Sequence, residues 1–192
     1  MIVISTWSLL TVFVLRSLLP PPLLLLSLMQ VLYPPRNMKA ISAVHFWRLG
    51  HQMTSSKAPA GRTTAFDAKL FAIRLDVSKA TSMDIEHIIL ITNSLGSARR
   101  SVDPSVHSGQ AYSLVICSAL QSFFCSSSSY RIEFWDCFST AEWSLHQIVH
   151  NNVTNTRIAA ELYPATSINF LHSKSIISCL DIWRTLFNHP TV

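Results

Sequence analysis

Two neighbouring segments near the middle of the chain constrain its fold more than any other feature. Apolar residues recur at i, i+4, i+7 and i+11 across residues 66–77, which is the spacing of one face of an α-helix. We expect this helix to begin after Thr63 or Thr64 and to end near Ser82. The segment His87–Thr92 is short and almost wholly apolar, which is typical of a strand buried on both faces of an α/β sheet. Together the two segments predict an α/β fold.

Strands and helices are expected to alternate through residues 38–155. Apolar residues cluster or alternate in the expected strands, and Gly, Pro and Ser mark the turns. The expected elements are, in chain order, a strand at 40–47, a turn at Gly50, a loop at 57–62, the helix and strand above, a short helix at 94–100, a long helix at 108–124, a strand at 131–135 and a helix at 142–150. The apolar side of the long helix should consist of Leu114, Cys117, Ala119, Leu120, Phe123 and Phe124. A C-terminal tail, residues 156–192, should add one or two helices.

The first residues form a hydrophobic leader. No Asp or Glu occurs before Asp67. The apolar runs at 2–15 and 23–32 are separated by prolines, which cannot continue a helix. Neither run reaches about 17 residues, the lower limit for a membrane-spanning helix. Three interpretations remain: a poor signal anchor, a hydrophobic helical hairpin, or sequence never selected to fold because a frameshift or wrong start codon replaced the true beginning. We expect residues 1–33 to lie outside the domain.

Neither the cysteines nor the histidines form a metal site. The four cysteines show no C-x-x-C spacing, which zinc sites commonly use. His146 and His150 are four residues apart on an expected helix, but Gln147 stands where the H-E-x-x-H motif has its Glu. We therefore expect reduced thiols and no bound metal.

Four short segments carry the motifs of the expected domain: Asp67-Ala68-Lys69, Thr92-Asn93-Ser94, Phe134-Trp135-Asp136 and Ala141-Glu142-Trp143. In this order and spacing they resemble the ribonuclease H domain of retrotransposons, fungal ones especially. The resemblance covers about residues 38–155. It implies a mixed sheet flanked by helices, incomplete here at its N-terminal strand.

The family hydrolyses the RNA strand of an RNA–DNA hybrid with two Mg²⁺ ions, which require oxygen ligands. It supplies them from an Asp on the first strand, a Glu on the first helix, an Asp ending the fourth strand and often an acid on the last helix. The resemblance puts Lys69 and Asn93 at the second and third positions. The fourth falls near Asn151 or Asn152, and the leader offers no acid for the first. Asp67 lies about 200° around the helix from position 69 and cannot replace the Glu.

The resemblance therefore implies a degenerate domain that does not cleave hybrids and needs no cofactor. Weak binding of nucleic acid, such as an RNA–DNA hybrid, could outlast the loss of the acids, because contacts to phosphates do not use them. Ser94, Arg99 and Arg100 are the candidate residues for these contacts. Ordinary capping and solvation of a helix end explain the same three residues.

Two other functions compete with this hypothesis. The chain could be a small membrane-associated protein that contacts a membrane through residues 2–32, or a repurposed interaction module that uses exposed aromatic residues such as Trp143 and Trp183. The net charge of +5 comes from scattered basic residues and forms no basic run. An intracellular location is expected, with a membrane location as the alternative.

Overall fold

The computed structural model describes the chain over residues 2–6, 24–32, 39–48, 51–136, 144–154 and 166–187. The strands in these residues are β1 (Ile2–Thr6), β2 (Leu24–Leu32), β3 (Lys39–Arg48), β4 (His51–Arg62), β5 (His87–Thr92) and β6 (Arg131–Asp136). The helices are α2 (Ala65–Ala80), α3 (Leu95–Ser101), α4 (Gln110–Ser126), α5 (Ser144–Thr154) and α6 (Ile168–Phe187).

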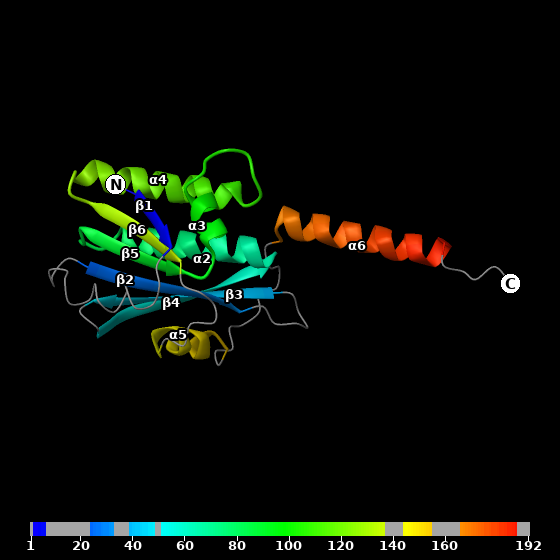
Figure 1. Cartoon of the computed structure of the whole chain (residues 1–192), viewed down its shortest axis with the longest axis horizontal. Helices are drawn as coiled ribbons and strands as arrows, with labels where there is room; N and C mark the ends of the chain where they lie inside the picture. Colours follow the sequence, from blue (N-terminus) through cyan, green and yellow to red (C-terminus); the bar gives the residue numbers. More distant parts are fainter. Residues whose placement is uncertain are drawn as a thin grey trace.

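The strands form one mixed sheet in the order β1-β6-β5-β2-β3-β4. Neighbours from β1 to β2 run parallel, whereas β3 and β4 are added antiparallel as a hairpin. Helices α2, α3 and α4 cover one face of the sheet, and α5 lies against the other face at β2 and β3 (Figure 1). The expected α/β fold, a mixed sheet flanked by helices, is confirmed.

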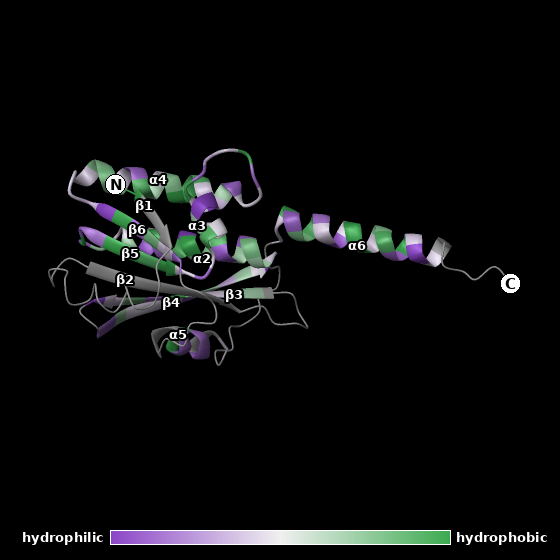
Figure 2. Ribbon diagram, viewed as in Figure 1, coloured by the Kyte–Doolittle hydropathy of each residue, from purple (hydrophilic) through white to green (hydrophobic). Residues whose placement is uncertain are grey.

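The hydrophobic core lies between the sheet and the pair α2 and α4. Alternate residues of β5 and β6 point into it, as the two-residue period of a strand requires. The fully buried apolar members from the strands and the two helices are Val44, Phe46, Ile88, Leu90, Ile132, Phe134, Ala72, Ile73, Val77, Ala80 and Ile116. Figure 2 shows the hydrophobic colouring of β5 and of the helix sides that meet it.

The predicted helix at residues 66–77 is confirmed as α2. Thr64 is its N-cap, and the Thr64 hydroxyl accepts a hydrogen bond from the backbone N–H of Asp67 at 3.2 Å. The predicted apolar stripe is buried at Leu70 and Val77. The long helix is confirmed as α4, but its buried side was predicted wrongly at Leu114, which is 49% exposed. The helix buries Leu120, as predicted, together with Ile116 one turn before it, and Leu114 does not belong to this stripe.

The predicted loop at residues 57–62 is wrong, because these residues complete β4. Pro59 pairs with Ile41, and Ala60 is the extra residue of a bulge before Gly61 pairs with Ala40. Pro and a bulge are tolerated here because β4 is the outermost strand of the sheet. Gly61 has φ of 75°, a left-handed conformation that glycine adopts without strain.

The expectation that residues 1–33 lie outside the domain is wrong for both strands in that range. Residues 2–6 form edge strand β1, paired with β6. Residues 24–32 form β2, which pairs with β3 on one side and β5 on the other, at the centre of the sheet. The sheet therefore does not lack its N-terminal strand, and the frameshift and helical-hairpin interpretations lose support. A short apolar run of Leu, Val and Met between prolines is compatible with a helix or a strand. Only its pairing with strands far away in the chain determines which of the two forms.

The C-terminal tail forms α6, which projects away from the body of the molecule (Figure 1). It is joined to the sheet by a bridge between Arg62 and Thr166 and by a 2.9 Å hydrogen bond from the Ser167 N–H to the Arg62 carbonyl. Trp183 is 57% exposed on this helix. Trp143 lies outside the described residues. Within the part of the chain that the structure describes, no helix has the length and hydrophobicity to cross a membrane.

Candidate functional site

The carboxyl ends of three parallel strands meet at one edge of the sheet. Thr92 ends β5 and lies in register with Asp136, the last residue of β6, which in turn pairs with Thr6 of β1. Asn93 follows directly after Thr92, so it stands at the carboxyl end of β5 as the sequence predicted. Crevices at the carboxyl ends of parallel strands are the usual location of sites in open α/β sheets.

Helix α2 brings Lys69 to the same edge. A methyl group added at Gly96 would lie 3.8 Å from the Phe66 ring, so the first turn of α3 lies against the first turn of α2. Lys69 is one helical turn beyond Phe66, and its charge interacts with that of Asp136. We call Lys69, Asn93 and Asp136 the carboxyl-end site.

The ammonium of Lys69 is half-buried and has no close ionic partner. In the described residues no carboxylate lies within 4.0 Å of it, and it makes no hydrogen bond there. Burial lowers the pKa of Lys69, and the negative charge of Asp136 offsets this lowering only in part. The protein thus holds a cation in a place that disfavours its charge.

Asp136 was not among the predicted site residues. Its position follows from the parallel pairing of β5 with β6, which brings the last residues of both strands together. The segment Phe134-Trp135-Asp136 was noted only as a family motif. An acid at the end of an expected strand was a usable signal, but sequence alone does not identify which strand lies next to β5.

The other predicted positions lie apart from this cluster or cannot be described. Asn152 is in α5, and its side chain is not among those described. Asp67 is 1% exposed, and its Oδ1 accepts a hydrogen bond from the Ser108 hydroxyl at 2.8 Å. Asp67 therefore faces the start of α4 rather than replacing Lys69, as the 200° helix rotation predicted.

The three residues predicted to contact nucleic acid differ in what they already bind. The Ser94 hydroxyl caps α3 by accepting from the Ser97 N–H at 3.3 Å. Arg100 pairs with Asp103, with 3.2 Å between Nη1 and Oδ2. Arg99 is exposed on the same helix. Of the three, Arg99 has the freest access to a ligand.

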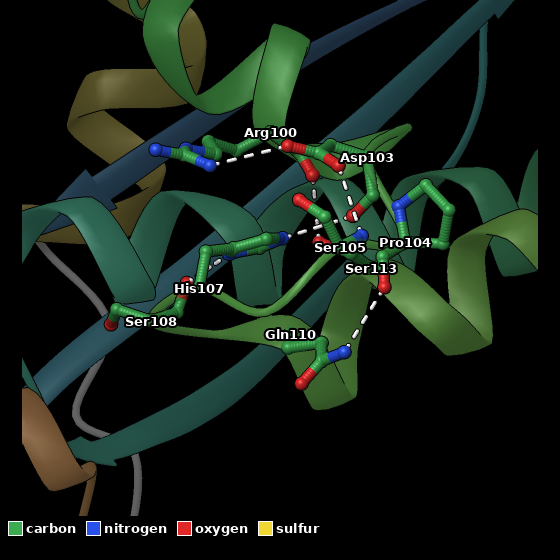
Figure 3. Close-up of polar contacts among 8 residues, drawn as sticks. All are labelled: Arg100, Asp103, Pro104, Ser105, His107, Ser108, Gln110 and Ser113. Carbon is green, nitrogen blue, oxygen red and sulfur yellow. Dashed lines mark hydrogen bonds and ion pairs between the residues drawn. The ribbon is translucent and has the colours of Figure 1, made fainter.

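Asp103 organises the loop between α3 and α4 (Figure 3). Its Oδ1 accepts from the Ser105 N–H at 3.0 Å, and hydrogen bonds from the Ser105 side chain and backbone lower the pKa of the Asp103 carboxyl. His107 contacts the carbonyl of Asp103 at 3.0 Å, and the Gln110 amide donates to the Pro104 carbonyl at 3.0 Å. Side-chain hydrogen bonds thus fix the end of the short helix at Asp103-Pro104, where the sequence predicted it. One of them joins Arg100 to Asp103, so Arg100 is bound within the loop.

The carboxyl-end site does not fit a pair of magnesium ions. Mg²⁺ needs several hard oxygen ligands, whereas this site offers one carboxylate, one amide and an ammonium. The described residues contain no group of three or more His, Cys, Asp or Glu side chains placed to hold a metal. A positive charge at Lys69 would in addition repel a dication.

No family model matches this chain, and no curated protein matches it. Among solved structures the fold is similar to ribonuclease H1 of the halophilic archaeon Halobacterium salinarum, with a TM-score of 0.45 and 9% identity over 60% of this chain and 86% of that one. It is also similar to the N-terminal ribonuclease H domain of a Mycobacterium tuberculosis protein, with a TM-score of 0.46 and 14% identity over 59% of this chain and 86% of that one. Identities this low transfer no activity, so the residues of the carboxyl edge must decide what the site can do.

Proposed function

We propose that this chain is a degenerate ribonuclease H-like domain of retrotransposon type, inactive in hybrid cleavage but able to bind nucleic acid weakly. The observation that carries the proposal is the composition of the carboxyl-end site. Lys69 and Asn93 occupy the positions where the sequence resemblance calls for Glu and Asp, and both lie at the carboxyl edge of the sheet.

Charge explains why this replacement abolishes metal-dependent hydrolysis. A carboxylate and a dication about 4 Å apart attract by about 8 kcal/mol at an effective dielectric near 20, and an ammonium at that distance repels by as much. Each 1.4 kcal/mol is about tenfold in affinity. Even after strong screening, a lysine at position 69 in place of the family's Glu lowers metal affinity by several orders of magnitude.

The central strand supports the same conclusion. The family carries its first acid on the first strand, and β2 has the central position between β3 and β5 that such a strand would take. Residues 24–32 contain no Asp or Glu. The backbone of the strand is present, and the ligand it would carry is absent.

A cleavage assay tests the proposal. The purified chain is incubated with a 5′-labelled RNA–DNA hybrid and either Mg²⁺ or Mn²⁺, and the products are separated by denaturing electrophoresis. We expect no cleavage above the protein-free rate, while an added bacterial ribonuclease H digests the same hybrid in the same buffer. Metal-dependent cleavage that co-purifies with the chain and is lost on heating would overturn the proposal.

A further inference from the structure

We propose that Lys69 directly binds a backbone phosphate of nucleic acid, so that the carboxyl-end site holds its ligand without a metal ion. This inference rests on the proposed function and specifies how the same site would work.

The unpaired state of Lys69 is the first argument. An ammonium carries three hydrogen-bond donors, and none of them is engaged by the described residues. Partial burial without an ionic partner disfavours its charge, yet the fold places it near the open end of the parallel strands. A phosphodiester oxygen would supply both the missing acceptor and the missing negative charge.

The type of each replacement is the second argument. Carboxylates only accept hydrogen bonds, so they approach a phosphate only through a bridging cation. The Lys69 ammonium and the Asn93 amide both donate, and each can bond a phosphate oxygen directly. Both replacements therefore convert a position that would bind metal into one that binds the anion itself.

The surroundings fix where the phosphate would lie. Asp136 attracts the ammonium toward the end of β6 without forming an ion pair within 4.0 Å. Its carboxylate repels an anion, so a phosphate is favoured on the side of Lys69 that faces away from Asp136. Arg99, exposed on α3, can meet a neighbouring phosphate of the same strand.

Binding of a fluorescein-labelled RNA–DNA hybrid, followed by anisotropy in EDTA, tests the inference. We expect the unmodified chain to bind in EDTA at least as tightly as in Mg²⁺, because Mg²⁺ only competes for the phosphates. Lys69→Gln should weaken binding about three- to tenfold and reduce the slope of log affinity against log salt by about 0.9, the value for one lost phosphate contact on a duplex.

Lys79→Gln is the matched control, because Lys79 is exposed in the last turn of the same helix and the exchange is identical. It should leave affinity and salt slope nearly unchanged, and Lys69→Arg should retain most of the binding. Circular dichroism checks that each variant is folded. Lys69→Met gives the same comparison should the glutamine variant fold poorly.

The outcomes separate the inference from the proposed function. Equal affinities for Lys69→Gln and Lys79→Gln, or binding that disappears in EDTA, would overturn the phosphate contact while hybrid binding stands. If the unmodified chain binds no hybrid even at low salt, the proposed binding function fails as well.

Discussion

Lys69 and Asn93 change the chemistry of the sheet edge in the same direction. Lys69 brings a positive charge and Asn93 a neutral amide to the positions where the sequence resemblance expects a Glu and an Asp, and Asp136 is the one carboxylate of the carboxyl-end site. The half-buried position of Lys69 disfavours its charge, which is the kind of local cost that proteins keep at sites with a ligand. Acids placed at both positions should therefore create metal affinity.

The double variant Lys69→Glu with Asn93→Asp tests this directly. It would gather three carboxylates at the carboxyl-end site, and we expect it to bind Mn²⁺ at least tenfold more tightly than the unmodified chain, a difference of about 1.4 kcal/mol or more. Isothermal titration calorimetry measures the change. Hybrid cleavage should stay absent, because residues 24–32 still supply no acid.

Lys79→Glu with Asn169→Asp is the control for charge alone. It makes the same exchanges at residues that have no part in the carboxyl-end site, Lys79 in the last turn of α2 and Asn169 in α6, and should not create a Mn²⁺ site. Equal Mn²⁺ affinity in the two double variants would show that Lys69 and Asn93 do not share one site.

At the scale of elements, the contact between α2 and α4 depends on Gly109. This residue is the N-cap of α4 and has φ of 77°, in the left-handed region that favours glycine. A methyl group added there would lie 2.6 Å from Leu70 Cδ1 and 3.3 Å from Asp67 Oδ1. The close approach leaves room only for a hydrogen atom.

Gly109→Ala should lower the free energy of unfolding by about 2–4 kcal/mol, from the left-handed strain of about 1–2 kcal/mol and overpacking against Leu70. Thermal unfolding followed by circular dichroism measures this. Gly96→Ala is the matched control, because its added methyl meets the Phe66 ring at an ordinary 3.8 Å and Gly96 lies within a helix. It should be neutral or slightly stabilising. Equal melting temperatures for the two variants would contradict the role given to Gly109.

The sequence predicts those elements whose signals are local. The period of α2, the apolar run of β5 and the Asp103-Pro104 stop after α3 each depend on a few neighbouring residues, and the structure has all three. The end of β4 was missed because Pro59 is acceptable only in an edge strand. An outer position in the sheet is a property of topology, which a local pattern does not contain.

The candidate site likewise contains one residue that the sequence alone could place and one that it could not. Asn93 could be placed from the sequence because it directly follows an evident strand. Asp136 could not, because its nearness to Lys69 depends on β6 lying beside β5 and on α2 packing across the same sheet. The place of β2 also depends on pairing with strands far away in the chain, and its composition pointed equally to a leader.

At the scale of the whole molecule, two parts contrast in how they bury apolar residues. The sheet and the helices on its faces enclose a continuous core, in which Ile73, Ile88 and Phe134 are fully buried. Helix α6 exposes its side chains from Leu171 to Thr185 (Figures 1 and 2). The stability of the domain should therefore come almost entirely from the first part.

Removal of residues 166–192 should leave the melting temperature within about 6 °C of that of the full chain. The truncation removes the bridge to Arg62 and one backbone hydrogen bond, worth about 0.5–1.5 kcal/mol. In a chain of this size, 1 kcal/mol corresponds to about 2–4 °C.

Ile116→Ala in the full chain shows how large the effect of a core substitution is. Ile116 is fully buried, and its loss should cost about 2–5 kcal/mol. Calorimetry of the three proteins makes the comparison, and a truncation as destabilising as Ile116→Ala would mean that α6 packs onto the domain in solution.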